Sequence, residues 1–215
     1  MNRFFNCNAV VLKQRSSGTS NREAFFLTET LGIIPCTVYG GSKSKLKAIV
    51  SQFHSGILYC YHDPVRGTYK VQDFDVKAYR MGLRENYMRT MTAIAICETV
   101  FAGHGGGGNW TAAISMIDTA FDAMENAGEQ DVKKVFVHFL WNWANLLGVL
   151  PDISGRFTSS ENAAILKWLQ SDNSGDPESI FSTCPMNEDR LESAKNYCYQ
   201  ILSGSYGRSL NSWKY

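Results

Sequence analysis

The chain has 215 residues, 44% of them hydrophobic, which is enough to bury the core of one large or two small domains without disulfide staples. No apolar run approaches the roughly 18 residues of a membrane span, and Asn6, Cys7 and Asn8 interrupt the N-terminal apolar stretch, so we expect a cytoplasmic protein with no membrane partner. The closest two of the six cysteines, Cys184 and Cys198, are 14 residues apart, which excludes CxxC pairs and favours reduced, buried thiols.

The formal net charge of +1 hides an uneven distribution of charge along the chain. Residues 1–80 carry eleven Lys and Arg against five acids, a net charge of 11 − 5 = +6, so the remaining residues sum to 1 − 6 = −5. A basic segment is the electrostatic footprint of a polyanion-binding protein. Chance segregation of charges over a solvated surface would explain the same count.

The first 80 residues have the composition of short strands separated by turns, with β-branched and aromatic residues between clusters of Gly, Ser, Asn and Pro. We predict strands over residues 4–14, 22–29, 32–39, 53–62 and 67–77. Five strands of this length predict a small, closed or nearly closed antiparallel barrel. The OB-fold is the common five-stranded solution and binds single strands, although an SH3-like barrel has the same strand count.

Beyond residue 82 the apolar residues recur at helical spacing, three and four positions apart. We predict helices over residues 83–102, 110–127, 129–147, 160–170 and 187–203. The expected fold class is therefore α+β, with an N-terminal five-stranded OB-fold barrel followed by an all-helical domain. The domains are expected at residues 1–80, the nucleic-acid-binding domain, and 81–215.

The sequence contains no arrangement that favours an enzyme. The glycine-rich residues 103–108 are followed by Asn109 and Trp110 instead of the Lys and Ser or Thr of a phosphate-binding loop, so a helix-to-helix connection is favoured. The four histidines are far apart and have no metal-ligand spacing, and there is no GxSxG motif or carboxylate pair. We expect no catalytic residue, no metal and no cofactor.

The strongest local signal is the segment from Tyr39 to Lys47, in which Lys43, Lys45 and Lys47 alternate after two glycines. Lysines beside glycines suit sequence-independent phosphate contacts, and Tyr39 could stack on a base. Lys13, Arg15 and Arg22 flank an earlier turn of the same basic segment. A solvated loop explains the lysines equally well, but together these residues favour nucleic-acid binding.

These residues resemble the bacterial RecO recombination mediators. The similar stretches are Ala9 to Arg15, Phe25 to Gly32, Val38 to Leu46, and Gln52 with Phe53, in the family's order and spacing, and later Phe139 to Gly148 with Pro151. The resemblance is good over the first third of the chain. Over the rest it is looser and consists mainly of the helical character.

The resemblance implies a DNA repair protein without catalytic activity. Such a protein binds single- and double-stranded DNA, anneals complementary strands, and helps a recombinase replace single-strand binding protein, together with RecR. The implied DNA contacts here are Lys13, Arg15, Arg22, Tyr39, Lys43, Lys45, Lys47 and Lys70. It also implies that the helical domain takes the acidic, apolar tail of single-strand binding protein. Lys133, Lys134 and His138 are the candidates for that contact, although the family's basic pair aligns nearer Val137 and His138 and a solvated helix face explains the lysines equally well.

The sequence departs from the family pattern at two places. Many members carry a four-cysteine zinc site after the third predicted helix, where this chain has Gly155, Arg156 and Phe157, so we predict no zinc. The family's acidic turn before the second strand is here Thr19, Ser20 and Asn21. A protein-interaction scaffold without nucleic-acid binding is the alternative function, and a small-molecule enzyme would need a deep polar pocket that the sequence does not indicate.

Overall fold

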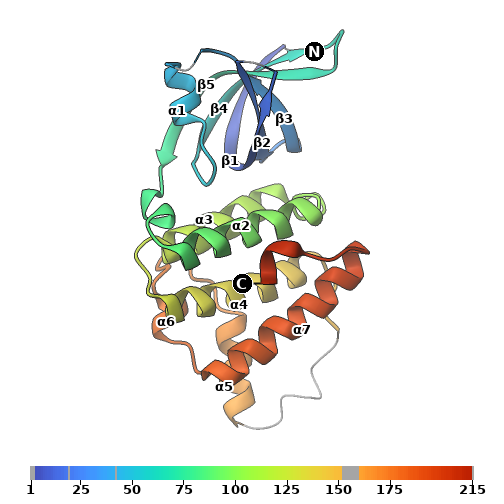
Figure 1. Cartoon of the computed structure of the whole chain (residues 1–215). Helices are drawn as coiled ribbons and strands as arrows, with labels where there is room; N and C mark the ends of the chain where they lie inside the picture. The colour runs from blue at the N-terminus through green and yellow to red at the C-terminus, as the bar shows by residue number, and fades with distance from the viewer. Residues whose placement is uncertain (1–2, 19, 42, 152–159, 215) are drawn as a thin grey trace. The chain divides into compact units, whose positions relative to one another are not determined.

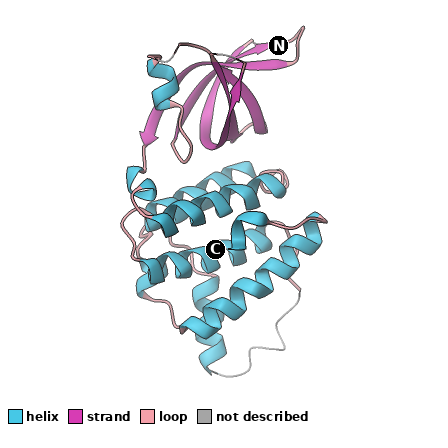
Figure 2. Ribbon diagram, in the orientation of Figure 1, coloured by secondary structure: helices cyan, strands magenta, loops and turns pink. Residues whose placement is uncertain are grey.

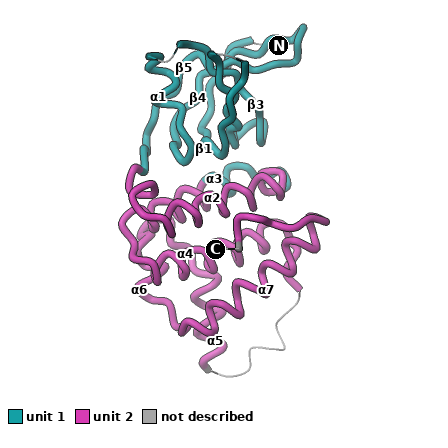
Figure 3. The backbone as a smooth tube through the Cα atoms, viewed as in Figure 1, with its two compact units in different colours: residues 1–80, 107–114 teal, residues 81–106, 115–215 magenta. Residues whose placement is uncertain are grey.

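The computed structural model describes residues 3–18, 20–41, 43–151 and 160–214. The chain divides into two compact units (Figure 3). One comprises Met1–Arg80 with Gly107–Ile114, and the other comprises Met81–Gly106 with Ser115–Tyr215. The first unit holds a barrel and the second holds helices, which confirms the predicted α+β class (Figure 2).

The barrel is closed and has the strand order β1-β2-β3-β5-β4, with β4 returning to β1. Its elements are β1 (Phe4–Ser17), β2 (Asn21–Thr28), β3 (Gly32–Val38), α1 (Lys45–Ile49), β4 (Ser55–Asp63) and β5 (Thr68–Ala78). All strand pairs are antiparallel except β3 with β5, which is parallel and pairs Cys36 with Tyr69 and Thr37 with Lys70. Five strands in a Greek-key closure are the OB-fold arrangement. The expected barrel is therefore present, but it is not entirely antiparallel.

The barrel core consists of side chains that alternate along each strand. Phe26 and Phe74 meet at its centre with their ring centroids 5.5 Å apart, edge to face. The other buried members are Ala9, Val11, Ala24, Ile34, Cys36, Val38, Val50, Leu58, Cys60 and Val71.

A β-bulge interrupts the pairing of β1 with β2 between Val11 and Lys13. Val11 lies opposite the inward-facing Phe26, whereas Lys13 lies opposite Phe25, on the outer face. Without the extra residue, the regular alternation would place Lys13 and Arg15 on the core side with Val11. The bulge thus allows β1 to be apolar inside and basic outside along one continuous strand.

The structure corrects two details of the predicted barrel. β1 continues to Ser17, three residues further than expected, because Ser16 and Ser17 pair with the start of β2. Residues 45–49, expected to be loop, form helix α1, and Leu46 and Ile49 from this helix pack against the barrel core. The β4–β5 hairpin extends past the barrel beside the N-terminal end of β1 (Figure 1).

The helical unit contains α2 (Tyr87–Ala102), α3 (Trp110–Met124), α4 (Glu129–Leu146), α5 (Ser160–Leu169), α6 (Ser179–Ser182) and α7 (Glu188–Tyr206). Two short 3-10 helices, η1 (Met81–Arg84) and η2 (Asn211–Lys214), complete it. The first predicted helix begins later than expected, because the Asn86 side chain caps α2 by accepting from the backbone N–H groups of Met88 and Arg89.

Helix α4 is the centre of the helical unit and contacts α2, α5, α6 and α7. Trp143 of α4 is fully buried and donates its indole N–H to the Tyr206 hydroxyl at 2.8 Å. Near the C-terminus, Trp213 packs edge to face on Phe136 and donates to Thr99 Oγ1 at 3.1 Å. Within the described part of the chain, none of these helices has the length and apolar character needed to cross a bilayer.

Candidate nucleic-acid interface

Strand pairing places one row of side chains across the outer surface of the barrel. Paired positions on neighbouring strands share a face of the sheet, and the register joins each member of the row to the next. This outer row is Phe4, Tyr61, Lys70, Thr37, Glu23 and Arg15. Two of the residues predicted to contact DNA, Arg15 and Lys70, therefore lie in one row. Three strand intervals separate them, a path of about 14 Å around the curved surface of the barrel at the usual strand spacing.

Lys70 is half-buried, and two tyrosine rings flank its ammonium group. The Nζ atom lies 5.5 Å from the centroid of Tyr61 and 6.0 Å from that of Tyr39, within the range of cation–π contact. It also lies 3.9 Å from a carboxylate oxygen of Asp63. The structure thus brings the predicted residues Tyr39 and Lys70 together, and it adds Tyr61, which the sequence analysis did not single out.

Arg15 occupies the other end of the outer row. Its Nε atom pairs with the Glu23 carboxylate, and its guanidinium carbon lies 5.2 Å from the centroid of Phe25. Its side chain nevertheless remains 64% exposed, so the remaining N–H groups stay available to a ligand. Lys13 lies two residue pairs from Arg15 along β1. It is exposed and has no ion-pair partner in the described segments.

Two of the predicted DNA contacts, Lys47 and Arg22, have hydrogen-bond partners within the barrel unit. The Lys47 ammonium donates to the Ser20 carbonyl oxygen, and Arg22 donates to the Lys47 carbonyl oxygen at 3.1 Å and to Gln14 Oε1 at 3.3 Å. These bonds join α1 to the β1–β2 hairpin. Lys43 and Lys45 in the same segment are exposed, and neither forms an ion pair with any residue that the structure describes.

The outer face also carries aromatic side chains that the sequence analysis did not select. Phe4 is 60% exposed and Tyr59 37% exposed, although strand residues of this size are usually covered. Phe4 packs on Tyr61 with the ring centroids 5.1 Å apart. The alternation of Tyr59 and Tyr61 in the predicted strand was the available signal, but only the register shows that both face outward beside Phe4.

A second row of the same face lines a shallow hollow of about 480 Å³. Asn6 pairs with Tyr59 across β1 and β4, and Tyr59 pairs with Asp73 across β4 and β5. A bulge in β5 at Gln72 keeps Asp73 on the outside, next to the inward-facing Phe74. The hollow therefore has aromatic walls and polar groups at its edge.

The three residues predicted to bind a partner each have different neighbours in the helical unit. Lys133 pairs with Glu188 at 2.6 Å, whereas Lys134 pairs with Asp131 at 2.8 Å. His138 is buried with its ring 5.3 Å from Trp168, and burial lowers its pKa to about 4. The imidazole is therefore neutral near pH 7 and presents no positive charge to an acidic peptide.

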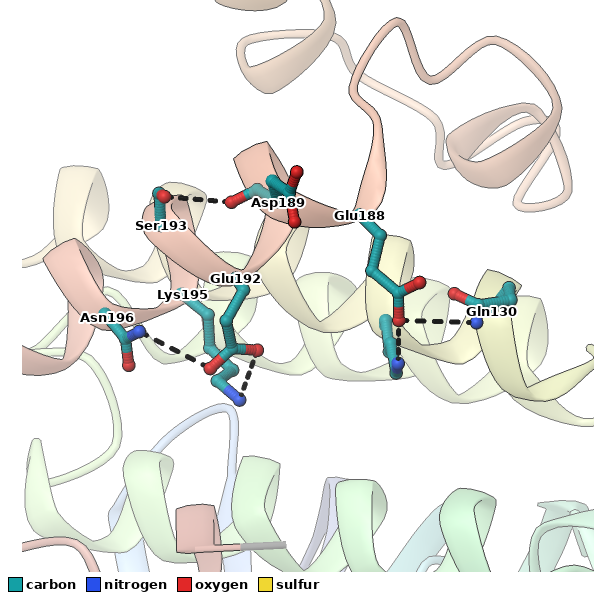
Figure 4. A network of polar contacts seen from close by, with 8 residues as sticks. Gln130, Glu188, Asp189, Glu192, Ser193, Lys195 and Asn196 are labelled. Atoms are coloured by element: carbon teal, nitrogen blue, oxygen red, sulfur yellow. Dashed lines mark hydrogen bonds and ion pairs between the residues drawn. The ribbon is translucent and has the colours of Figure 1, made fainter.

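Lys133 borders an apolar pocket of about 340 Å³ in the helical unit. Its lining includes Met88 and Met91 of α2, Phe136 of α4, Leu191 of α7 and Trp213. At its edge, ion pairs join Lys133 to Glu188 and Lys195 to Glu192, in the polar network that Figure 4 shows along α7. The sequence analysis missed the two methionines and Lys195, because their helices meet only in the folded unit.

The remaining motifs add no further site. Residues 103–108 connect α2 to α3 as expected, and residues 105–108 all have positive φ. Gly155, Arg156 and Phe157, the position of the family's zinc loop, lie outside the described residues. Elsewhere, no three His, Cys, Asp or Glu side chains cluster as metal ligands in the described segments.

The cysteines are free thiols, as predicted, and all but Cys184 are buried. The sulfur atoms of Cys36 and Cys60 lie 3.7 Å apart in the barrel core. The hydrogen bond between them, together with burial, raises the pKa of Cys36. Burial also raises the pKa of Cys198, to about 12.

Comparison with models of protein families and with curated proteins finds no match for this chain. Its class is therefore defined by its architecture, an OB-like barrel with a basic and aromatic outer face, joined to a helical unit.

Proposed function

We propose that this chain is a DNA-binding protein of recombinational repair that works without covalent chemistry. In this proposal it anneals complementary strands and helps to load a recombinase on single-stranded DNA covered by single-strand binding protein. The observation that carries the proposal is the outer row, which places Arg15 and Lys70 on the outer surface of a closed OB-type barrel, with tyrosine rings beside Lys70.

OB-folds bind oligonucleotides over strands β2 and β3 and through the loops that follow β1 and β4. In this chain the outer row crosses β2 and β3 at Glu23 and Thr37. On β1 the row includes Arg15, and Lys13 lies two residues away. The exposed Arg66 lies in the loop between β4 and β5. The cations are thus distributed where an OB-fold ligand would run.

Annealing requires the neutralisation of two phosphate backbones and no broken bond. Lysine and arginine side chains that contact phosphate leave the Watson–Crick edges of the bases free to pair. Exposed rings such as Phe4 can hold unpaired bases apart until a complementary strand arrives. Phosphate contacts by the cations and base contacts by the rings both need only side chains of the outer face.

The proposed partner site is the apolar pocket of the helical unit. Its floor of Met, Phe and Trp side chains suits an apolar peptide end, and Lys133 and Lys195 would attract acidic residues of the single-strand binding protein tail. Both lysines already pair with glutamates, so the tail would have to compete for them. RecR is proposed as a partner on the family resemblance alone.

A protein-interaction scaffold is the second candidate. Acidic neighbours favour it, because Glu23 and Asp63 partly neutralise Arg15 and Lys70. On this alternative the barrel binds no nucleic acid, and the helical pocket supplies the function.

Fluorescence anisotropy with a labelled 30-nucleotide single strand, titrated at several salt concentrations, tests the proposal. Changing Lys13, Lys43 and Lys45 to Glu should weaken binding about 30-fold and lower the slope of log K against log salt by about two. The matched control changes the exposed Lys77, Lys167 and Arg208 to Glu, with the same loss of net charge, and should bind nearly as wild type.

Equal binding by the two triple variants would contradict the assignment of Lys13, Lys43 and Lys45. Absence of DNA binding by the wild type, together with retention on immobilised single-strand binding protein but not on a form without its tail, would establish the scaffold instead.

A further inference from the structure

We propose that the hollow on the outer face of β1, β4 and β5 binds one unstacked nucleobase and prefers bases that carry an exocyclic amino group. The inference rests on the proposed nucleic-acid-binding function. It adds a contact to a base to the contacts that the cations make with the phosphate backbone of the nucleic acid. The residues that would form this base site are Phe4, Asn6, Tyr59, Gln72 and Asp73.

The walls of the hollow are suited to a flat aromatic ligand. Phe4 and Tyr59 leave much of their ring surface open to solvent, at 60% and 37% exposure, and they lie on adjacent strands. Packing of Tyr61 against Phe4 at 5.1 Å holds the Phe4 ring in place. Every nucleobase has a π-face, so exposed rings on a strand surface offer stacking to any of them.

The edge of the hollow supplies hydrogen-bonding groups. Asn6 and Gln72 carry amides that can both donate and accept, and the described residues give them no side-chain partner. One oxygen of Asp73 accepts from the Phe74 backbone N–H at 2.8 Å, which fixes the carboxylate and leaves its other oxygen for a ligand. An ionised carboxylate only accepts hydrogen bonds.

This chemistry discriminates among bases. Adenine, cytosine and guanine carry amino groups that can donate to Asp73, as cytosine N4 does to acidic side chains in protein–DNA complexes, whereas thymine has none. Thymine offers only its N3–H donor, and the carbonyl oxygens on both sides of it would repel the carboxylate. The base site therefore favours cytosine and purines over thymine.

The surroundings indicate a nucleotide in a strand. The Lys70 Nζ atom lies 5.5 Å from the ring centroid of Tyr61, and Tyr61 packs on Phe4. Lys70 pairs with Tyr61 across β4 and β5, so a cation borders the base site. A strand whose base enters the hollow would bring a neighbouring phosphate to Lys70. Duplex DNA keeps its bases stacked, so this contact is available only to single strands or frayed ends.

The test uses the full chain and three labelled 20-nucleotide probes, oligo-dC, oligo-dT and an oligomer of abasic sites, measured by anisotropy. The wild type should bind oligo-dC about tenfold more tightly than the abasic oligomer, and more tightly than oligo-dT. Changing both Phe4 and Tyr59 to Ala should remove this advantage without changing abasic affinity. Asp73→Asn should abolish the preference for dC over dT. Tyr87→Ala, which removes another exposed ring, is the matched control.

A second measurement separates this inference from the proposed function. Titration of dCMP and TMP into ¹⁵N-labelled protein should shift the side-chain amide signals of Asn6 and Gln72 with dCMP and less with TMP. Equal affinity of the wild type for oligo-dC and the abasic oligomer would overturn the base site while leaving backbone binding intact. If the wild type binds no oligonucleotide but still shows the dCMP shifts, the proposed function is wrong and the base site stands. If it shows neither oligonucleotide binding nor dCMP shifts, both the proposed function and the base site are wrong.

Discussion

Arg22 of β2 donates a hydrogen bond to the carbonyl oxygen of Lys47 in α1 at 3.1 Å, while the Lys47 ammonium reaches back to the Ser20 carbonyl oxygen. Two basic residues that the sequence marked as DNA contacts thus hold a helix against a hairpin. Lys47 therefore has a structural role that its exposed neighbours Lys43 and Lys45 lack, and measurements of stability and DNA binding can separate the two roles.

The first prediction separates these roles. Arg22→Met should lower the free energy of unfolding by about 1–2 kcal/mol, because it leaves partly buried acceptors without their donor. Lys45→Met, an exposed neighbour, should leave stability within about 0.5 kcal/mol of wild type and weaken DNA binding. Urea unfolding and anisotropy on the same samples provide both readouts. Equal stability of the two variants would show that the Arg22 bonds contribute nothing.

The second prediction concerns the Arg15–Glu23 ion pair. Glu23→Gln removes the negative charge beside Arg15 on the outer row, so single-strand affinity should rise about threefold and the salt dependence should steepen. The pair is partly exposed, so the change should cost little stability. Asp75→Asn beside Lys77 is the matched control, because it frees a lysine outside the outer row. Identical gains in both variants would indicate a nonspecific charge effect.

The third prediction concerns pH and the buried His138. Burial holds its pKa at about 4, against 6.5 for the ordinary group, so between these values the unfolded chain binds a proton that the folded chain does not. Stability should therefore fall as pH drops from 6.5 towards 4, by a total on the order of 3 kcal/mol. Urea unfolding at pH 7, 5.5 and 4.5 measures the slope.

The matched variant for that measurement is His138→Gln. It should be less stable at pH 7, because its side chain replaces the imidazole that packs on Trp168 and lies 3.2 Å from the Asn173 amide. It should also lose most of the pH slope between 6.5 and 4. A variant that keeps the full slope would assign the effect to other groups.

The fourth prediction concerns a close approach between strands. A Cβ atom at Gly56 of β4 would lie 2.1 Å from the carbonyl oxygen of Asp75 on β5, so no side chain fits without moving a strand. Gly56→Ala should destabilise the barrel by at least about 2 kcal/mol. Gly67→Ala, in an open turn at positive φ, tests the backbone effect alone and should cost about 1 kcal/mol. Circular dichroism melts of both variants give the comparison.

Strand composition predicted the barrel because apolar alternation and turn residues are local properties. The outer row was not predictable, because it depends on which residues face one another across strands and on the bulge after Val11. Simple alternation would have placed Lys13 and Arg15 on the face of Val11. Helix α1 was missed because it is only five residues long and two of them are lysines, so it shows no helical apolar periodicity. Leu46 and Ile49 pack against the barrel core, and this packing accounts for the helix.

The helical segments were predicted from their apolar spacing, but the arrangement of His138 was not. Its neighbours in the sequence are apolar, which indicated burial, yet its polar contacts include Ser171 and Asn173, which follow α5. The apolar pocket likewise combines α2, α4 and α7, whose contacts no local pattern specifies.

The parallel pairing of β3 with β5 at Cys36–Tyr69 and Thr37–Lys70 closes the barrel through a short stretch of contact. The outer row crosses this closure between Thr37 and Lys70. A strand bound from Arg15 to Lys70 would span it and favour the closed form over any state in which β3 and β5 separate. Bound DNA should then stabilise the closed barrel, so the melting temperature should rise with the logarithm of the DNA concentration above Kd. Amide exchange in β3 and β5 should slow more than in the rest of the chain.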